Sequence, residues 1–229
     1  MDSKKKYQAE MAFFTLLAIF LASLVTSNLI FQKFFTWSPF GWYTFELSVG
    51  ILPYPITFIV TDIISEIYGK KRANQVVYIG FVASIFTLGI VILANYVKAT
   101  TWSPVDDTTF THVFGFTFIA VGASMTAYLV AQLVDVQMFH FWKKLTNGKH
   151  LWLRNNGSTF SSQFIDTFLI LLILCYFEVI EWHLFTNLLI QGFLFKVLIA
   201  LIDTPIVYLS VWVFRKKFGL KSALEKLDF

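Results

Sequence analysis

Six long apolar segments divide the chain, and short polar stretches rich in Lys and Arg separate most of them. A helix needs roughly 20 apolar residues to cross a bilayer, and each segment provides them. The pattern predicts an all-α membrane protein, with six transmembrane helices in one bundle and a single domain over residues 1–229. The expected spans are Ala12–Gln32, Leu47–Tyr68, Ala73–Val97, Phe116–Phe141, Ser158–Phe177 and Asn187–Phe214.

Composition excludes a water-soluble fold. Of the 229 residues 57% are hydrophobic and only 14% are charged, whereas about a quarter are charged in a typical soluble domain. Six spans leave no room for a separate ATPase or other soluble domain. We attribute the net charge of +4 to loops at a lipid surface and expect no nucleic-acid partner.

The basic residues predict the orientation in the membrane. Of the 18 Lys and Arg, 15 fall in the N-terminal segment, the second loop, the fourth loop and the C-terminal tail. The opposite side carries only Lys33 and Lys98. Because cytoplasmic loops are enriched in Lys and Arg, we expect both termini in the cytoplasm.

Prolines predict that the second and sixth helices are interrupted. Pro53 and Pro55 lie within the second apolar segment, and Asp203-Thr204-Pro205 lies within the sixth. The regular part of the second helix is then about Ile56–Tyr68, roughly 20 Å long, which is too short to span. Interrupted helices mark binding sites in transporters, although two ordinary proline kinks are the alternative.

Six charged side chains fall within the expected spans, where each costs a few kcal/mol or more. Helical spacing places Asp62, Asp135 and Asp166 on polar stripes, about two turns from the cytoplasmic ends of their helices. We therefore expect these three carboxylates to share one polar site. Hydrogen bonds that only hold the helices together are the alternative. The six residues are Asp62, Glu66, Asp135, Asp166, Lys196 and Asp203.

The charges within the spans predict pairing and protonation. Lys196 is the only cation among them, so we expect it to pair with Asp203 on its own face or with Asp166 on the neighbouring helix. Crowding of five carboxyl groups predicts that at least one is protonated. Glu66 is expected to be the weakest member of the set, because its side chain can reach the interface beside Lys70.

Several motifs, in order along all six spans, carry a family resemblance. They are Pro53-x-Pro55-x-x-Phe58-x-x-Thr61-Asp62, Glu66-Ile67-Tyr68-Gly69, Gln132-x-x-Asp135, Ser158-Thr159, Asp166-Thr167 and Phe195-Lys196-Val197-Leu198. Together they resemble the queuosine precursor transporter family, also called the vitamin uptake transporter family. That family is similar to the substrate-binding subunits of energy-coupling-factor vitamin importers. The resemblance implies import of a deazapurine, such as cyano-deazaguanine, across a bacterial inner membrane.

A deazaguanine is flat and presents adjacent N–H donors, which a carboxylate accepts side by side while amides serve the other edges. We therefore expect an intramembrane site that needs no cofactor or metal. Neither a His-Glu-x-x-His nor a Gly-x-Ser-x-Gly motif occurs, so no enzymatic activity is expected. The candidate substrate-binding residues are Asn28, Asp62, Gln132, Asp135, Gln163, Asp166 and Lys196.

Two questions stay open at this level. The alternative function is a substrate-capture subunit that docks onto a separate ATPase complex, for which Ala18-x-x-x-Ala22 offers a small-residue face. The energy source is either a proton bound at Asp135 or Asp166, or facilitated diffusion driven by consumption of the substrate. A homo-oligomer is also compatible with the sequence.

Overall fold

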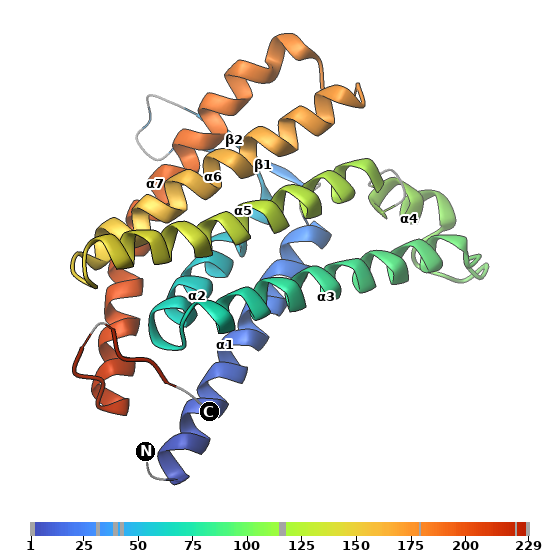
Figure 1. Cartoon of the computed structure of the whole chain (residues 1–229). Coiled ribbons are helices and arrows are strands. Elements are labelled where there is room, and N and C mark those ends of the chain that lie inside the picture. Colours follow the sequence, from blue (N-terminus) through green and yellow to red (C-terminus); the bar gives the residue numbers. More distant parts are fainter. Residues whose placement is uncertain are drawn as a thin grey trace.

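The computed structural model describes residues 3–30, 33–38, 41, 44–114, 118–178, 180–222 and 224–227 (Figure 1). Most of these residues are helical. The elements are α1 (Ser3–Ile30), β1 (Phe34–Trp37), β2 (Phe45–Ser48), η1 (Val49–Ile51), α2 (Tyr54–Ile67), α3 (Lys70–Tyr96), α4 (Asp107–Phe114), α5 (Phe118–Leu145), α6 (Leu151–Tyr176), η3 (Trp182–Leu184) and α7 (Phe185–Phe218), where η marks a 3-10 turn.

The predicted class, an all-α membrane protein, is confirmed. Five stretches of the described chain are long and apolar enough to cross a bilayer: α1, η1 with α2, α3, α6, and η3 with α7. In addition, α5 is 28 residues long and runs beside α6 (Figure 1). The count of six spans stays a prediction. Two of its expected limits, Gln32 and Phe116, lie outside the described residues.

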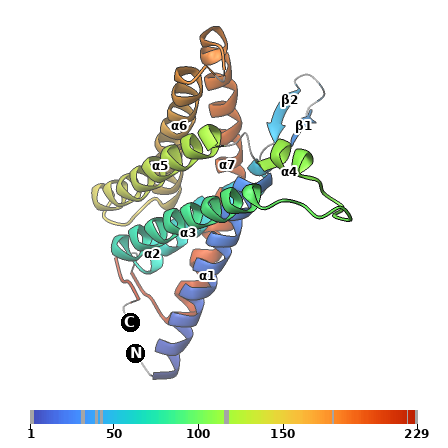
Figure 2. The ribbon, with the colours of Figure 1, turned by 90° about the vertical axis from the view of Figure 1, so that its right-hand side faces the viewer.

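The short helix α2 occupies the interior of the bundle. It contacts α1, α3, α5 and α7, while α5 packs along α6 and α6 along α7 (Figures 1 and 2). Ile64 and Ile67 of α2 are completely buried and belong to the same apolar cluster as Phe20 of α1 and Val76 and Val77 of α3. Polar residues on the other faces of α2 are therefore also enclosed by helices, away from lipid.

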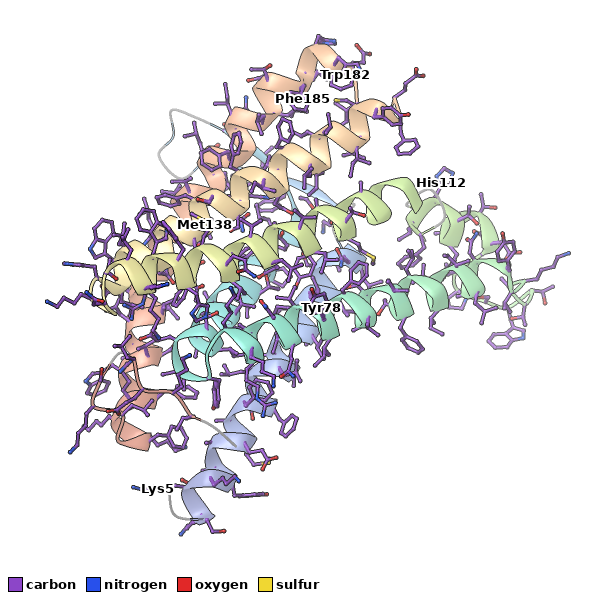
Figure 3. The ribbon with its side chains drawn as sticks, viewed as in Figure 1. Lys5, Tyr78, His112, Met138, Trp182 and Phe185 are labelled. Carbon is purple, nitrogen blue, oxygen red and sulfur yellow. The ribbon has the colours of Figure 1, made fainter. Side chains whose placement is uncertain are left out.

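The outer surface of the bundle is apolar, as lipid requires. On α3 the side chains of Tyr78, Val82 and Phe86 are 53%, 66% and 68% exposed, and Tyr78 is labelled in Figure 3. A patch of this kind is unfavourable in water but satisfied by lipid tails. The helix α3 presents this face away from the rest of the bundle.

The second apolar segment is divided into three elements. Its first residues close a two-stranded antiparallel hairpin in which Phe34 pairs with Ser48. The 3-10 turn follows, capped by a hydrogen bond from the backbone N–H of Gly50 to the Ser48 hydroxyl at 3.2 Å. Helix α2 starts at Tyr54 with Pro55 in its first turn, where a missing N–H costs no intrahelical bond. The 14-residue helix is close to the predicted Ile56–Tyr68.

Two helices differ from their predicted form. Helix α7 continues without a break from Phe185 to Phe218, with Pro205 inside it, so the expected interruption of the sixth helix is absent from the described residues. Helix α6 begins at Leu151, seven residues before the predicted start at Ser158. Arg154, assigned to a loop from the sequence, is consequently a helical residue.

The segments expected in the cytoplasm lie at one end of the bundle. The Tyr68 hydroxyl donates to the Ala9 carbonyl at 2.8 Å, and the backbone N–H of Leu227 donates to the Ile67 carbonyl at 2.8 Å. Both termini lie at this end in Figures 1 and 2, whereas Figure 3 shows Trp182 and His112 far from Lys5. The grouping is compatible with the predicted orientation, which stays a prediction.

Candidate functional site

Polar side chains of α2, α5, α6 and α7 meet inside the bundle in three successive layers. On α2 Asp62 and Glu66 are four residues apart, and on α6 Ser162 and Asp166 are four residues apart, so each pair shares one face of its helix. We call the layers the cation layer (Glu66, Lys143, Arg154, Arg215), the carboxyl layer (Asp62, Asp135, Ser162) and the cavity layer (Tyr54, Gln163, Asp166, Lys196).

In the cation layer one carboxylate binds three cations. Glu66 is completely buried, and its Oε2 accepts a hydrogen bond from Lys143 at 2.8 Å. Its Oε1 accepts from Arg154 at 2.7 Å and from Arg215 at 2.5 Å. Because these cations come from α5, α6 and α7, Glu66 on α2 ties four helices together at one end of the bundle.

The expectation that Glu66 reaches the interface beside Lys70 was wrong. The Lys70 ammonium donates to the side-chain amide oxygen of Gln137 instead. Glu66 turns inward because α6 starts early enough to bring Arg154 into the bundle, where the guanidinium is only 2% exposed. A buried carboxylate is tolerated when charged hydrogen-bond donors surround it.

In the carboxyl layer two aspartates face each other. Asp62 is 2% exposed and Asp135 is fully buried, and Oδ1 of Asp62 and Oδ2 of Asp135 have no hydrogen-bond partner among the described residues. The Ser162 hydroxyl of α6 donates to Oδ1 of Asp135 at 2.9 Å. The structure thus brings together two of the three carboxylates that were expected to share a site.

Gln132 lies beside this layer and is occupied by contacts with α2. Its Oε1 accepts from the Thr61 hydroxyl at 3.3 Å, and its Nε2 donates to the Thr57 hydroxyl at 3.4 Å. All three side chains are completely buried. These bonds are long, so the amide is held loosely between α5 and α2.

In the cavity layer Asp166 binds Lys196, which confirms one of the two predicted pairings. Oδ2 of Asp166 accepts from the Lys196 ammonium at 2.5 Å and from the Tyr54 hydroxyl at 3.0 Å. The ammonium also lies 5.5 Å from the centre of the Tyr54 ring. Asp166 is 1% exposed, so this pair neutralises a charge that would otherwise be buried alone.

Asp166 lies deeper than predicted. It is 15 residues from the first residue of α6, which corresponds to about 22 Å of helix, against the roughly 9–12 Å expected. Asp62, by contrast, is five residues from the end of α2, or about 8 Å. The error arose because the polar start of α6 was read as a loop. Asp166 therefore lies deeper in the bundle than the carboxyl layer that holds Asp62 and Asp135.

A small cavity of about 30 Å³ lies beside the Asp166–Lys196 pair, between α2, α6 and α7. This volume holds one or two water molecules. A larger ligand therefore requires the surrounding side chains to move. The residues that line the cavity are Ile51, Tyr54, Pro55, Phe58, Thr159, Gln163, Phe195, Lys196, Ile199, Ala200 and Asp203.

The cavity combines hydrogen-bond donors, acceptors and aromatic rings. Lys196 and Tyr54 supply donors, whereas Oε1 of Gln163 and Oδ1 of Asp166 are buried acceptors without a partner in the described part of the chain. Two aromatic rings also line the cavity, Phe58 from α2 and Phe195 from α7. Such a set suits a planar ligand whose polar edge carries both N–H and carbonyl groups.

Only some of the candidate residues predicted from the sequence lie at the cavity. Gln163 and Lys196 line the cavity, and Asp166 is bonded to Lys196 at its edge. Asp62, Gln132 and Asp135 lie in or beside the carboxyl layer. Asn28 is half-buried on α1 and does not line this cavity.

Sequence reasoning missed Tyr54 as a site residue. The sequence did contain an indication of this role, because Tyr54 directly follows Pro53 and is therefore the first residue of the buried helix α2. Arg154, Lys143 and Arg215 were missed as partners of Glu66 and counted only as loop charges. Nothing in the local sequence distinguishes them from the other basic residues.

The part of the chain that contains most of these layers matches a known protein family. A family model described as "Putative vitamin uptake transporter" matches residues 48–210, which include all three layers except Arg215. The "Probable queuosine precursor transporter" of Bacillus subtilis is 28% identical over 162 residues, covering 70% of each chain. The protein of the same name from Haemophilus influenzae is 29% identical over 127 residues, covering 55% of this chain and 51% of its own.

No solved structure gives a significant match to this chain. The family match nevertheless covers well over half of the sequence, and its limits enclose the buried polar layers and the cavity. The resemblance read from the motifs is thereby confirmed, together with a multi-pass location in the membrane. The chain belongs to the vitamin uptake transporter family.

Proposed function

We propose that this protein imports a deazapurine precursor of queuosine across the bacterial inner membrane and binds it in the cavity between α2, α6 and α7. The observation that carries the proposal is the buried Asp166–Lys196 pair beside a cavity lined by Gln163, whose Oε1 has no hydrogen-bond partner among the described residues. The names of the two relatives support the choice of substrate.

The polar groups of the cavity complement the edge of a guanine-like base. A carboxylate such as Asp166 accepts two adjacent N–H groups side by side, as the ring N–H and the exocyclic amine of a deazaguanine present them. The Lys196 ammonium then donates to the neighbouring carbonyl oxygen. The substrate therefore replaces part of the Asp166–Lys196 bond and leaves both charges compensated.

Aromatic side chains supply the surfaces against which the flat ring stacks. Phe58 packs edge-on against Tyr54, with ring centres 5.4 Å apart. Phe195 packs against Trp37 and Phe45 of the β1–β2 hairpin at 5.6 Å and 5.5 Å. The hairpin thus holds one wall of the cavity in place, and a base sliding between these rings gains apolar contact as well as hydrogen bonds.

Uptake of a labelled deazapurine tests the proposal in cells that lack their own importer and cannot synthesise the precursor. Cells expressing this protein should accumulate label, and Asp166→Asn should abolish accumulation at equal protein levels. Asp106→Asn, which changes an exposed residue before α4, is the matched control and should transport normally. Equal uptake by the Asp166→Asn protein and the control would refute binding at this cavity.

The docking alternative has one observation in its favour. Ala18 and Ala22 lie on an exposed face of α1, where a partner helix could pack closely. Purified protein in liposomes separates the two functions. A self-sufficient importer carries label into the liposomes without ATP or any other protein, whereas a capture subunit binds the label and carries none inside.

A further inference from the structure

Asp203 is a charged residue of the cavity wall that lies far from both ends of its helix. It comes 18 residues after the first residue of α7 and 15 before the last, which corresponds to about 27 Å and 22 Å of helix. The short side chain of an aspartate cannot reach the aqueous phase at either end over such distances. A carboxylate at this depth costs a few kcal/mol or more, and such groups are normally paired with another group.

The described part of the chain offers Asp203 no such partner. Its side chain is half-buried and takes part in no hydrogen bond or ion pair among the described residues. Lys196 is the only cation among the described residues that line the cavity, and its ammonium is bonded to Asp166 at 2.5 Å. The three cations of the cation layer all bind Glu66. The negative charge of Asp203 is therefore left without a counter-charge at the cavity.

The packing of α6 against α7 fixes the position of Asp203. The hydroxyl of the next residue, Thr204, accepts a hydrogen bond from the side-chain amide of Asn156 at 2.8 Å. Lys196, Ala200 and Asp203 are spaced by four and three residues on α7, so they share the face that borders the cavity. The two charged residues are about 10 Å apart along the helix axis. This wall of the cavity thus carries charged groups at two places, with the small side chain of Ala200 between them.

A carboxylate only accepts hydrogen bonds, and it binds charged donors most strongly. An uncompensated carboxylate in a cavity therefore favours a ligand that brings its own positive charge. We infer that Asp203 binds a protonated amine of the substrate, about two helical turns from the Asp166–Lys196 pair. Asp203 is then the residue that determines which substituent on the base this transporter prefers.

For the identity of the ring, this amine site rests on the proposed function. When the N–H edge of a deazaguanine binds Asp166, its five-membered ring lies on the opposite side of the molecule. A base with a one-carbon arm and a terminal amine on that ring matches the separation of about 10 Å along α7, once a hydrogen bond of about 2.8 Å is added at each end. The cavity therefore favours an aminomethyl-deazaguanine over the cyano compound, because a nitrile is neutral and has no N–H to donate to Asp203.

Equilibrium binding to the purified protein at neutral pH tests the amine site with two probes, aminomethyl-deazaguanine and cyano-deazaguanine. They share the ring and differ in the charge of the substituent. The wild type should bind the amine more tightly, and Asp203→Asn should weaken amine binding about tenfold or more, the size of one charge-assisted hydrogen bond. Nitrile binding should stay unchanged in this variant, which also shows that it is folded. The control Asp106→Asn should keep both affinities.

A second pair of probes, benzylammonium and benzonitrile, has the same difference in charge but lacks the guanine edge. At equal ionic strength benzylammonium should raise the thermal midpoint of the wild type more than benzonitrile does, and Asp203→Asn should remove the difference. A preference for the amine that is absent from both pairs of probes, or that survives in Asp203→Asn, would overturn the amine site. Deazapurines that bind without this preference would leave the proposed function standing. A preference seen only with the benzyl probes, with no deazapurine bound, would refute the proposed function and retain the amine site.

Discussion

Oε1 of Glu66 accepts a hydrogen bond at 2.7 Å from Arg154, a residue 88 positions later in the chain. Both side chains are almost entirely buried, and the contact joins the last turn of α2 to the first turn of α6 at one end of the bundle. The same oxygen binds Arg215 near the end of α7. The integrity of this end of the bundle therefore depends on one carboxylate.

Replacement of Glu66 by Gln should destabilise the protein strongly. The amide leaves Lys143, Arg154 and Arg215 packed together without a compensating charge, and removing one partner of a buried ion pair costs about 3–5 kcal/mol. Thermal unfolding in detergent should show a markedly lower midpoint. The control Glu181→Gln changes a carboxylate that is 79% exposed and should leave the midpoint in place. Similar midpoints for the two variants would contradict the role of the cation layer.

Replacement of Gly80 by Ala should separate α3 from α1. A Cβ atom at this position would lie 2.6 Å from a ring carbon of Phe20, which is itself completely buried. Overpacking of this kind costs about 1–3 kcal/mol. Gly89→Ala on the same helix meets no atom within 4 Å and should stabilise the helix slightly. Thermal unfolding of the two variants should therefore shift in opposite directions, and a shift of equal sign would contradict this packing.

The orientation of the chain can be checked with reporter fusions. Fusions made after Lys71, Lys144 and Lys217 should all show cytoplasmic activity, because the basic segments stay on the cytoplasmic side. The structure places these segments at one end of the bundle through the bonds of Glu66 to Lys143 and Arg215. Periplasmic activity at any of the three positions would invalidate the predicted topology.

The apolar pattern predicted the class of fold and the position of the buried helix after Pro53 and Pro55. These features depend on local sequence, since a bilayer selects apolar stretches and proline selects the first turn of a helix. The pairing of Lys196 was also predictable, because few partners exist for a charge within a span. The choice between Asp166 and Asp203 required the packing of α6 against α7.

The cation layer could not be predicted because its contacts are distant in sequence. Arg154, Asn155 and Asn156 look like a loop, yet all three are buried at the start of α6. Arg154 is tolerated there because Glu66 and the backbone carbonyl of Gly148 accept its hydrogen bonds. A hydropathy scan records the polarity of such residues and contains no information about their partners.

The pairing of Lys196 with Asp166 should be visible as rescue in a double variant. Lys196→Gln leaves Asp166 with only the Tyr54 hydroxyl, so a buried negative charge loses its cation and the free energy of unfolding should fall by about 3 kcal/mol. Adding Asp166→Asn removes that charge, and coupling energies of directly bonded pairs are about 0.5–3 kcal/mol. The thermal midpoint of the double variant should therefore recover part of the loss.

Asp203 provides the matched control for this cycle. It lines the same cavity and lies on the same helix as Lys196, but the described residues show no bond between the two. Lys196→Gln combined with Asp203→Asn should therefore remain as unstable as Lys196→Gln alone. Rescue by Asp203→Asn instead of Asp166→Asn would mean that the ammonium turns toward its own helix in the membrane. Because Asp166 and Lys196 are both assigned to the substrate, the rescued variant should fold yet fail to take up label, which separates folding from binding at one pair of residues.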